Sequence, residues 1–260
     1  QFAGVQILAF RGLSGVLLTL LAVLAGLAVL RVPRSHRLLV ALRILFAGAA
    51  AMALYTGLRT VPLAEATVLL LTAPVIITGL AALLLGDRLG WRRWCAVAVG
   101  FAGCVVVLWP SDLQIEAGAA IILGGALCWS LAAILTRRIG SAVPVPAQLF
   151  YLNLAFLAVC GAATPFDWRT PDGEGVLLLL LLGGIGFASQ FAILHGYRCA
   201  SPAVVAPFEY TALLWSALLG YLVWGEIPAS NVWIGGALIV GAGVYIAHRE
   251  TRPARPVRPR

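Results

Sequence analysis

The stretch LTAPVIITGLAALLLGDRLGWRRWCAVAVG, residues 71–100, decides the fold because residues 210–239 repeat its pattern as YTALLWSALLGYLVWGEIPASNVWIGGALI. With an offset of 139 residues, positions 49–105 and 188–244 share 13 identities in 57 positions. An apolar bias alone produces matches at Gly, Arg and Trp less readily than matches at Leu or Ala. Such matches are Gly57/Gly196, Arg59/Arg198, Gly86/Gly225 and Trp94/Trp233. The chain therefore contains an internal repeat.

Apolar runs long enough to cross a membrane make up most of each repeat. The 260 residues are 62% hydrophobic and 11% charged, whereas soluble domains carry about 25% charge. Runs near 20 residues span a hydrocarbon core of about 30 Å as helices. They cover approximately 12–30, 38–58, 63–85, 94–110, 117–136, 146–164, 175–195, 203–224 and 231–248. The sequence predicts an all-α membrane protein with nine transmembrane helices.

The two repeats are expected to lie in opposite orientations in the membrane. The offset moves each run by five spans, which is an odd number. The turn GDRLGWRRW of the first repeat contains three arginines, while its counterpart GEIPASNVW contains none. Alternating loops place 14 arginines on one side of the membrane. Because cytoplasmic loops are rich in arginine, we expect a cytoplasmic C-terminus and an external visible N-terminus.

The repeat also sets the expected domains. The first repeat covers 1–110, the second covers 111–248, and the basic, proline-rich tail 249–260 is expected to be disordered at the lipid headgroups. The fifth run has its counterpart before residue 1. We therefore expect a further helix upstream of Gln1, which would give ten helices and a cytoplasmic N-terminus.

The sequence contains no pattern that indicates an enzyme or a cofactor. The five cysteines are scattered and lack metal-ligand spacing, and none of the common catalytic or nucleotide-binding motifs occurs. The net charge of +8 comes with arginines at the ends of apolar runs. This placement favours membrane orientation over nucleic-acid binding.

Glu209 is the sharpest candidate for a functional site. Inverted repeats place binding sites near the membrane midplane, and ionisable groups there are costly and usually functional. Glu209 lies about seven residues into the eighth run, with Tyr210 and Trp215 nearby. It is interpreted as a substrate or proton site, or alternatively as a neutral packing group. Glu65, near the outer end of the third run, is a second candidate or an interfacial partner of Arg59.

Further candidates are polar and aromatic side chains inside the apolar runs. Instead of binding substrate, Tyr and Trp residues can belong to the aromatic belt at the membrane–water interface. A lone His is often an interface residue whose hydrogen bonds are satisfied. Pro74 is expected to kink the third run, and Arg43 is expected to snorkel to the cytoplasmic surface. The candidates are Thr72, Tyr55, Trp129, Tyr151, Asn153, Gln190 and His195. Asn153 is deep enough to need a hydrogen-bond partner.

Residues 59–108 and 197–246 resemble the EamA-type members of the drug/metabolite transporter superfamily, and ILAFRG at residues 7–12 resembles the start of that family's second helix. The resemblance covers residues 5–248. It implies two inverted five-helix repeats, a ten-helix fold of which the first helix is missing here, and a central cavity open to one side at a time. The subgroup that it resembles includes S-adenosylmethionine and riboflavin carriers. Asp87 departs from the Glu often found in that turn.

We therefore expect a secondary transporter, an exporter or exchanger, that moves a small polar or amphipathic organic metabolite by alternating access. It would lie in the inner (plasma) membrane among lipids, as a monomer or homodimer. Glu209 and Glu65 would sense protons, which allows proton coupling, or would bind a cationic group. Tyr55, Trp129, Tyr151, Tyr210 and Trp215 would line the cavity. The alternative is a non-transporting membrane scaffold or partner subunit. Substrate, direction and coupling ion stay open at this point.

Overall fold

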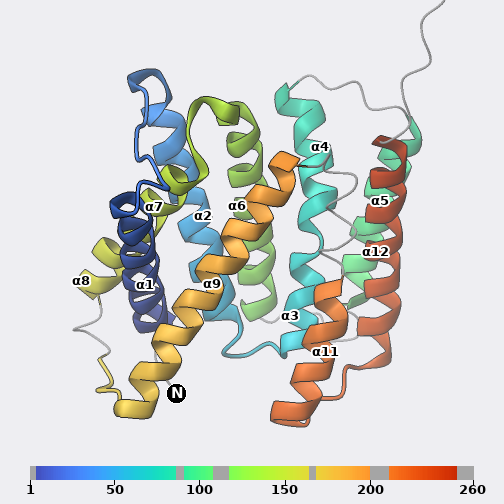
Figure 1. Ribbon diagram of the computed structural model, residues 1–260. Coiled ribbons are helices and arrows are strands. Elements are labelled where there is room, and N and C mark those ends of the chain that lie inside the picture. Colours follow the sequence, from blue (N-terminus) through green and yellow to red (C-terminus); the bar gives the residue numbers. More distant parts are fainter. Residues whose placement is uncertain (1–3, 86–90, 108–116, 164–167, 200–210, 251–260) are drawn as a thin grey trace, which may run out of the picture. The chain divides into compact units, whose positions relative to one another are not determined.

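The computed structural model describes residues 4–85, 91–107, 117–163, 168–199 and 211–250 (Figure 1). Over these residues the chain forms helices and turns, without a strand. The all-α class is confirmed, as expected where lipid offers the backbone no hydrogen-bond partner. The α-helices are α1 Gly4–Leu24, α2 Arg37–Gly57, α3 Leu63–Leu70, α4 Ala73–Leu85, α5 Trp91–Val107, α6 Ala117–Ile139, α7 Val145–Ala155, α8 Gly161–Ala163, α9 Gly173–Cys199, α11 Thr211–Trp224 and α12 Ser230–Glu250.

Several of these helices are apolar enough to lie in a membrane. By length and composition, four helical segments could cross a bilayer: Gly4–Leu24, Arg34–Gly57, Ala117–Ala142 and Gly173–His195. Shorter apolar helices cover Leu63–Ile77, Trp94–Val107, Val145–Cys160, Thr211–Trp224 and Ser230–Tyr245. Each segment overlaps one of the runs expected from the sequence. The number of membrane crossings stays a prediction.

The third apolar run is broken into two helices. α3 ends at Leu70 and α4 begins at Ala73. Between them the Thr72 hydroxyl donates a 2.6 Å hydrogen bond to the carbonyl of Leu69. Pro74 has no amide hydrogen, so it cannot donate the helical bond to the carbonyl of Leu70. The expected kink at Pro74 is confirmed as a turn that interrupts the helix at Leu71 and Thr72, just before the proline.

The chain divides into two compact units that interleave along the sequence. Unit 1 consists of residues 1–56 and 127–196, and unit 2 consists of residues 57–126 and 197–260. Each unit therefore combines residues of both expected repeats: unit 1 takes 1–56 from the first and 127–196 from the second, and the segment 57–126 of unit 2 crosses the expected boundary at residue 110. The compact units cut across the expected domains, which were defined by sequence similarity.

In unit 1, α1 and α7 pack closely through glycines. A Cβ atom on Gly12 would lie 2.6 Å from the carbonyl oxygen of Asn153 and from the amide nitrogen of Leu157. A Cβ on Gly15 would overlap the amide group of the Asn153 side chain. α7 continues into a π-helical turn, Phe156–Cys160, and then into α8. The buried core beside this contact contains Leu8, Ala9, Ala47, Ala132, Leu152, Phe156 and Cys160.

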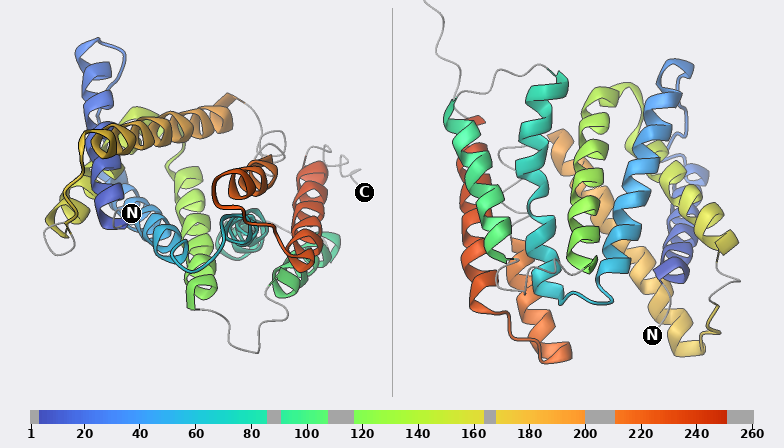
Figure 2. Two further views of the ribbon diagram at one scale, coloured as in Figure 1. Left: turned by 90° about the horizontal axis from the view of Figure 1, so that it is seen from below. Right: turned by 180° about the vertical axis from the view of Figure 1, so that it is seen from behind.

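In unit 2, α5 and α12 lie side by side in antiparallel directions (Figure 2). A Cβ on Gly103 would lie 2.8 Å from the carbonyl oxygen of Gly235. Farther along, Ala96 and Ala242 belong to one buried cluster. At the end of α5, the side-chain amide of Asn231 donates a 2.8 Å hydrogen bond from Nδ2 to the backbone carbonyl of Val107. α3 packs against α11 and α12.

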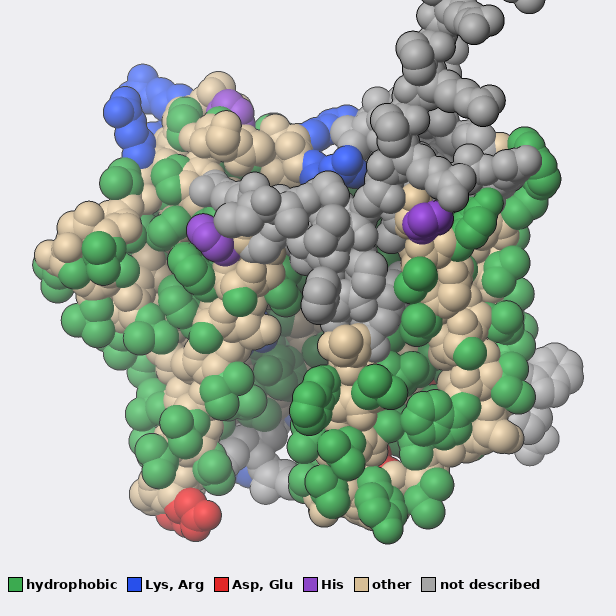
Figure 3. Space-filling view, turned by 45° about the vertical axis from the view of Figure 1, so that its right-hand side comes forward, with side chains coloured by type: hydrophobic (Ala, Val, Ile, Leu, Met, Phe, Trp, Pro, Cys, Tyr) green, Lys and Arg blue, Asp and Glu red, His purple; other side chains and the backbone are tan. Residues whose placement is uncertain are grey.

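The helices expose large apolar side chains, as a membrane protein requires. Leu24 is 84% exposed, and many other leucines on α1, α9 and α11 are exposed. Figure 3 shows hydrophobic side chains over the middle of the face in view, while the coloured charged side chains lie toward its ends. Such a surface favours lipid as its surroundings.

Candidate functional site

Buried polar side chains mark unit 1 as the place of the candidate site. Unit 2 has two such residues among those described, Thr72 and Ser216. Polar groups inside apolar helices are costly, so they usually face protein or a wet cavity. The buried polar residues of unit 1 are Gln6, Ser14, Thr19, Arg43, Ser130, Gln148 and Asn153.

Arg43 is a buried cation on α2, and the sequence-based expectation that it snorkels to the surface is wrong. Its side chain is 4% exposed. Its Nε donates a 2.7 Å hydrogen bond to the Thr136 hydroxyl on α6, which in turn donates 2.8 Å to the carbonyl of Ala132. The Nη1 atom is buried and has no hydrogen-bond partner. The side chain stays inside because it shares the buried face of α2 with Val40 and Ala47.

A second polar position lies where α1 faces α9. A Cβ on Gly183 would lie 2.5 Å from the Ser14 hydroxyl, and one on Gly186 would lie 3.2 Å from Nε of Arg11. The Arg11 guanidinium lies 5.8 Å from the centroid of the Phe156 ring, within range of a cation–π interaction. The Ser14 hydroxyl is buried without a hydrogen-bond partner. This contact of Arg11 and Ser14 with Gly183 and Gly186 is called the α1–α9 seam. It offers the cation of Arg11 and the unpartnered hydroxyl of Ser14 in one place.

Gln190 is the expected site residue that belongs to this seam. It lies one helical turn after Gly186, on the same face of α9. Its Oε1 atom is buried and has no hydrogen-bond partner. Buried polar atoms without partners need an explanation, such as a bound water or ligand. Gln190 and Ser14 can both bind a polar molecule here.

The other candidates in unit 1 have mainly structural contacts. Asn153 donates a 2.9 Å hydrogen bond to the carbonyl of Leu149 in its own helix, so its expected need for a partner is confirmed. The Tyr151 hydroxyl donates a long, 3.4 Å bond to the carbonyl of Leu30. Tyr55 packs against the core that contains Leu8. Trp129 on α6 is half-buried.

His195 lies near the far end of α9 and is exposed. Its ring stacks on Phe191, one turn earlier, with centroids 5.8 Å apart and planes at 7°. Gln190 is buried at its oxygen, whereas His195 is open, so the two candidates on α9 have different surroundings.

In unit 2 the structure describes three of the expected site residues. Thr72 is buried at the break between α3 and α4. Glu65 is half-buried in the first turn of α3, where a carboxylate is stabilised by the helix dipole. Trp215 on α11 is 62% exposed. Glu209 and Tyr210 lie outside the described residues.

Glu226 has a position that the sequence analysis did not foresee. It follows Gly225, whose φ of 70° ends α11 in a conformation that favours glycine. Its Oε2 accepts a 3.1 Å hydrogen bond from the backbone amide of Leu63, the first residue of α3. The side chain thus caps a helix from the other sequence repeat. The match of Asp87 to Glu226 in the repeat was the available signal.

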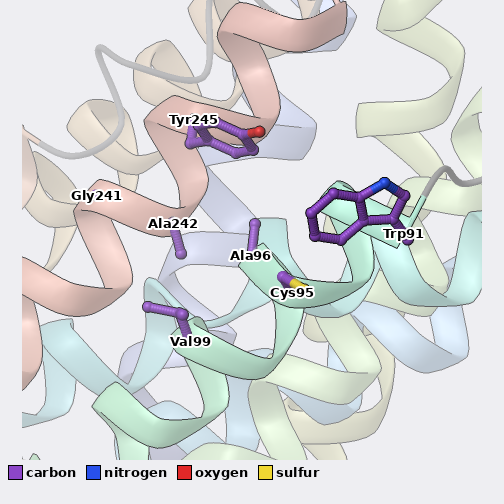
Figure 4. Close-up of a pocket in the computed structure, with 7 residues that line it drawn as sticks. All are labelled: Trp91, Cys95, Ala96, Val99, Gly241, Ala242 and Tyr245. Atoms are coloured by element: carbon purple, nitrogen blue, oxygen red, sulfur yellow. The ribbon is translucent and has the colours of Figure 1, made fainter.

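The groove between α5 and α12 is apolar and holds none of the expected site residues. It has a volume of about 380 Å³ and is lined by Trp91, Cys95, Ala96, Val99, Gly241, Ala242 and Tyr245. Figure 4 shows Trp91 projecting from α5 and Tyr245 from α12, with Ala96 and Ala242 between the helices. Its lining fits an acyl chain better than a polar metabolite. Among the described residues, no cluster of His, Cys, Asp or Glu could hold a metal ion.

Comparison with known proteins gives a consistent set of relatives. The model of the EamA-like transporter family matches residues 1–109 and 116–247. A riboflavin transporter of Rhizobium johnstonii is 32% identical over 231 residues, which cover 88% of this chain and 76% of that protein. A riboflavin transporter of Vibrio cholerae is 31% identical, covering 76% of this chain and 67% of that protein.

More distant similarities point the same way. An S-adenosylmethionine uptake transporter of Rickettsia felis is 26% identical, covering 75% of this chain and 67% of that protein. A crystal structure of a protein with 25% sequence identity has a TM-score of 0.67 and covers 98% of this chain and 90% of that chain.

Proposed function

Since this chain belongs to the EamA-like transporter family, and is a multi-pass membrane transporter and not an enzyme, we propose that it carries a small polar metabolite built on a planar nitrogen heterocycle. The observation that carries the proposal is the similarity to riboflavin and S-adenosylmethionine transporters. Riboflavin and S-adenosylmethionine both join a fused nitrogen heterocycle to a hydroxylated chain or sugar. The shared chemistry defines the class of cargo.

We propose alternating access between two inverted repeats as the transport mechanism. Helix bounds support the repeat: adding 139 to α5, Trp91–Val107, gives 230–246, and α12 begins at Ser230. Adding 139 to α4 gives 212–224, and α11 covers Thr211–Trp224. The bounds of α4 and α11 thus correspond closely, and α5 and α12 begin at corresponding positions.

The contacts within unit 2 also support an inverted repeat. The offset carries Ala96 to Gly235 and Gly103 to Ala242. Gly103 faces Gly235, and Ala96 shares a cluster with Ala242. The two contacts are therefore images of each other, as a two-fold axis between antiparallel helices requires. α1 and α7, which are also repeat partners, pack against each other through Gly15 and Asn153.

We infer that the cargo contacts the polar interior of unit 1. The buried, partnerless atoms of Arg43, Ser14 and Gln190 support this because a bound polar molecule would satisfy them. Trp129, the half-buried aromatic residue of α6, would stack on the heterocycle. The proposed role of Glu209, binding a proton or a cationic group, fits the sulfonium of S-adenosylmethionine.

Direction and location are further parts of the proposal. The Rickettsia felis relative is named for uptake, so inward transport or exchange is favoured here over the export expected from the sequence. Arginine placement supports a plasma-membrane protein with a cytoplasmic C-terminus.

Counterflow in proteoliposomes tests the proposal. Vesicles containing the protein are preloaded with unlabelled riboflavin or S-adenosylmethionine, and entry of the same labelled compound is followed. We expect preloading to accelerate entry of at least one compound relative to protein-free vesicles. No acceleration with either compound would refute this cargo class and favour the scaffold alternative.

A separate experiment tests the proposed binding of a proton by Glu209. A pH gradient is imposed on the same vesicles, with the wild type and with Glu209→Gln. We expect the gradient to change the wild-type rate and to have less effect in the variant. A Glu209→Gln protein with wild-type rates and wild-type pH dependence would remove Glu209 from the mechanism.

A further inference from the structure

Arg43 carries a charge whose burial calls for a partner. The side chain is 4% exposed on the apolar helix Arg37–Gly57. An ionised guanidinium among apolar helices is unfavourable unless a polar or anionic group balances it. Charged residues at such depth usually mark a functional pathway. The question is therefore which group completes the surroundings of Arg43.

The described residues of unit 1 do not supply an anion. Thr136 is neutral, and its hydroxyl proton is directed to the carbonyl of Ala132 at 2.8 Å, so its lone pair accepts from Nε of Arg43. Nη1 is buried and has no hydrogen-bond partner. The described carboxylates of unit 1 are Asp172 and Glu174, which are exposed at the start of α9. Asp172 is also engaged there, accepting a bond from the amide of Gly175.

The geometry favours a ligand with an anionic oxygen atom. The Thr136 bond at Nε fixes the plane of the guanidinium, because the group is rigid and flat. The Nη1 end is then left to donate. Arginine nitrogens donate strong, charge-assisted hydrogen bonds to carboxylate oxygens. A point-like lysine charge would not provide the same match.

We propose that Arg43, oriented by Thr136, binds a carboxylate of the cargo. S-adenosylmethionine presents this group, whereas riboflavin has none. The inference rests on the proposed transport function and deepens it by assigning one part of the cargo to one pair of residues. Arg43 is a binding residue, and Thr136 is a positioning residue.

Binding measurements with two matched probes test the assignment. The probes are S-adenosylmethionine and its decarboxylated form, which differ in the carboxylate. The purified protein in nanodiscs of zwitterionic lipid is titrated as wild type, Arg43→Met, Arg43→Lys, Thr136→Val and Arg37→Met. Arg37 is the matched control because it is an exposed arginine on the same helix.

The expected result is a selective loss. Arg43→Met should weaken binding of S-adenosylmethionine by roughly tenfold or more, while the affinity for the decarboxylated probe stays near the wild-type value. Arg43→Lys and Thr136→Val should give intermediate losses, and Arg37→Met none. Equal losses for both probes, or no loss in Arg43→Met, would overturn the proposal. If Arg43→Met does not fold, the Lys and Val variants provide the same comparison.

A second measurement separates this inference from the proposed function. The melting temperature is recorded in acetate, phosphate or chloride at one ionic strength. We expect acetate to stabilise the wild type and not Arg43→Lys or Arg43→Met. If neither riboflavin nor S-adenosylmethionine binds but acetate still stabilises through Arg43, the cargo class is wrong and the oxygen-binding site stands. If acetate has no effect and the two probes bind equally, the site is refuted.

Two further experiments test whether the anionic partner of Arg43 has another source than the cargo. If Glu209→Gln restores the stability of Arg43→Met, the guanidinium is paired with a carboxylate of its own chain, and the proposal is wrong. If the Arg43 variants differ from the wild type only in anionic-lipid nanodiscs, the oxygens belong to a lipid phosphate. That result would also overturn the assignment to the cargo.

Discussion

Replacing Gly235 by alanine should force α5 and α12 apart. The new Cβ would lie 2.5 Å from the carbonyl oxygen of Gly103 and 2.9 Å from the amide nitrogen of Val107, and it would overlap the Val107 side chain. Backbone atoms cannot rotate away, so the helices must separate. Overpacking of this kind costs about 1–3 kcal/mol. Alanine recovers up to about 1 kcal/mol through its higher helix propensity.

Gly241→Ala is the matched control on the same helix. A Cβ at Gly241 would meet no heavy atom within 4 Å. The helix-propensity gain is common to both variants, so the difference between them isolates the steric term. We expect Gly235→Ala to be less stable than Gly241→Ala by about 1–3 kcal/mol.

Unfolding by SDS in mixed micelles, followed by far-ultraviolet circular dichroism, measures this difference. The separation of α5 and α12 should appear as a lower SDS midpoint for Gly235→Ala. Equal midpoints for Gly235→Ala and Gly241→Ala would refute the close crossing at Gly103. The same result would remove one of the two contacts that support the inverted repeat.

Three other changes test single contacts. Gln6→Leu removes a buried side-chain amide that donates a 2.8 Å hydrogen bond to the carbonyl of Arg169 and accepts a 3.4 Å bond from the backbone amide of Arg169. Thermal melting should show a loss of about 1–3 kcal/mol in stability, and an unchanged melting temperature would contradict the contact. Glu226→Ala removes the cap on Leu63 and should cost about 0.5–2 kcal/mol, whereas Glu226→Gln keeps an acceptor; equal melting of the two variants would argue against capping. Pro74→Ala restores a backbone amide hydrogen near the interruption between α3 and α4. It should slow counterflow without lowering the melting temperature, and a wild-type counterflow rate would show that transport does not need the interruption.

The positions of most helices were predictable from the sequence. The run expected at 38–58 corresponds to α2, Arg37–Gly57, and the run at 117–136 to α6, Ala117–Ile139. Length and hydropathy are sufficient there because lipid leaves the backbone no alternative to internal hydrogen bonds. The interruption near Pro74 was also predictable, because proline lacks the amide hydrogen that a continuous helix needs at that position.

The surroundings of the candidate residues were less predictable. Whether Arg43 snorkels or is buried depends on Thr136, which lies 93 residues away and covers it from another helix. Glu226 likewise finds its partner 163 residues away, at Leu63. Residue type and depth indicate that a polar group needs a partner, as for Asn153. They do not reveal which helix supplies it.

The interleaving of the two units has a consequence for how the protein is made. Once residue 196 has been inserted, both segments of unit 1 are present, but unit 2 still lacks its second segment. The face of α5 around Gly103 therefore waits in the membrane without its neighbour until α12 has left the ribosome. During synthesis a chaperone, or a second nascent chain, therefore has an opportunity to bind the glycine-containing face of α5.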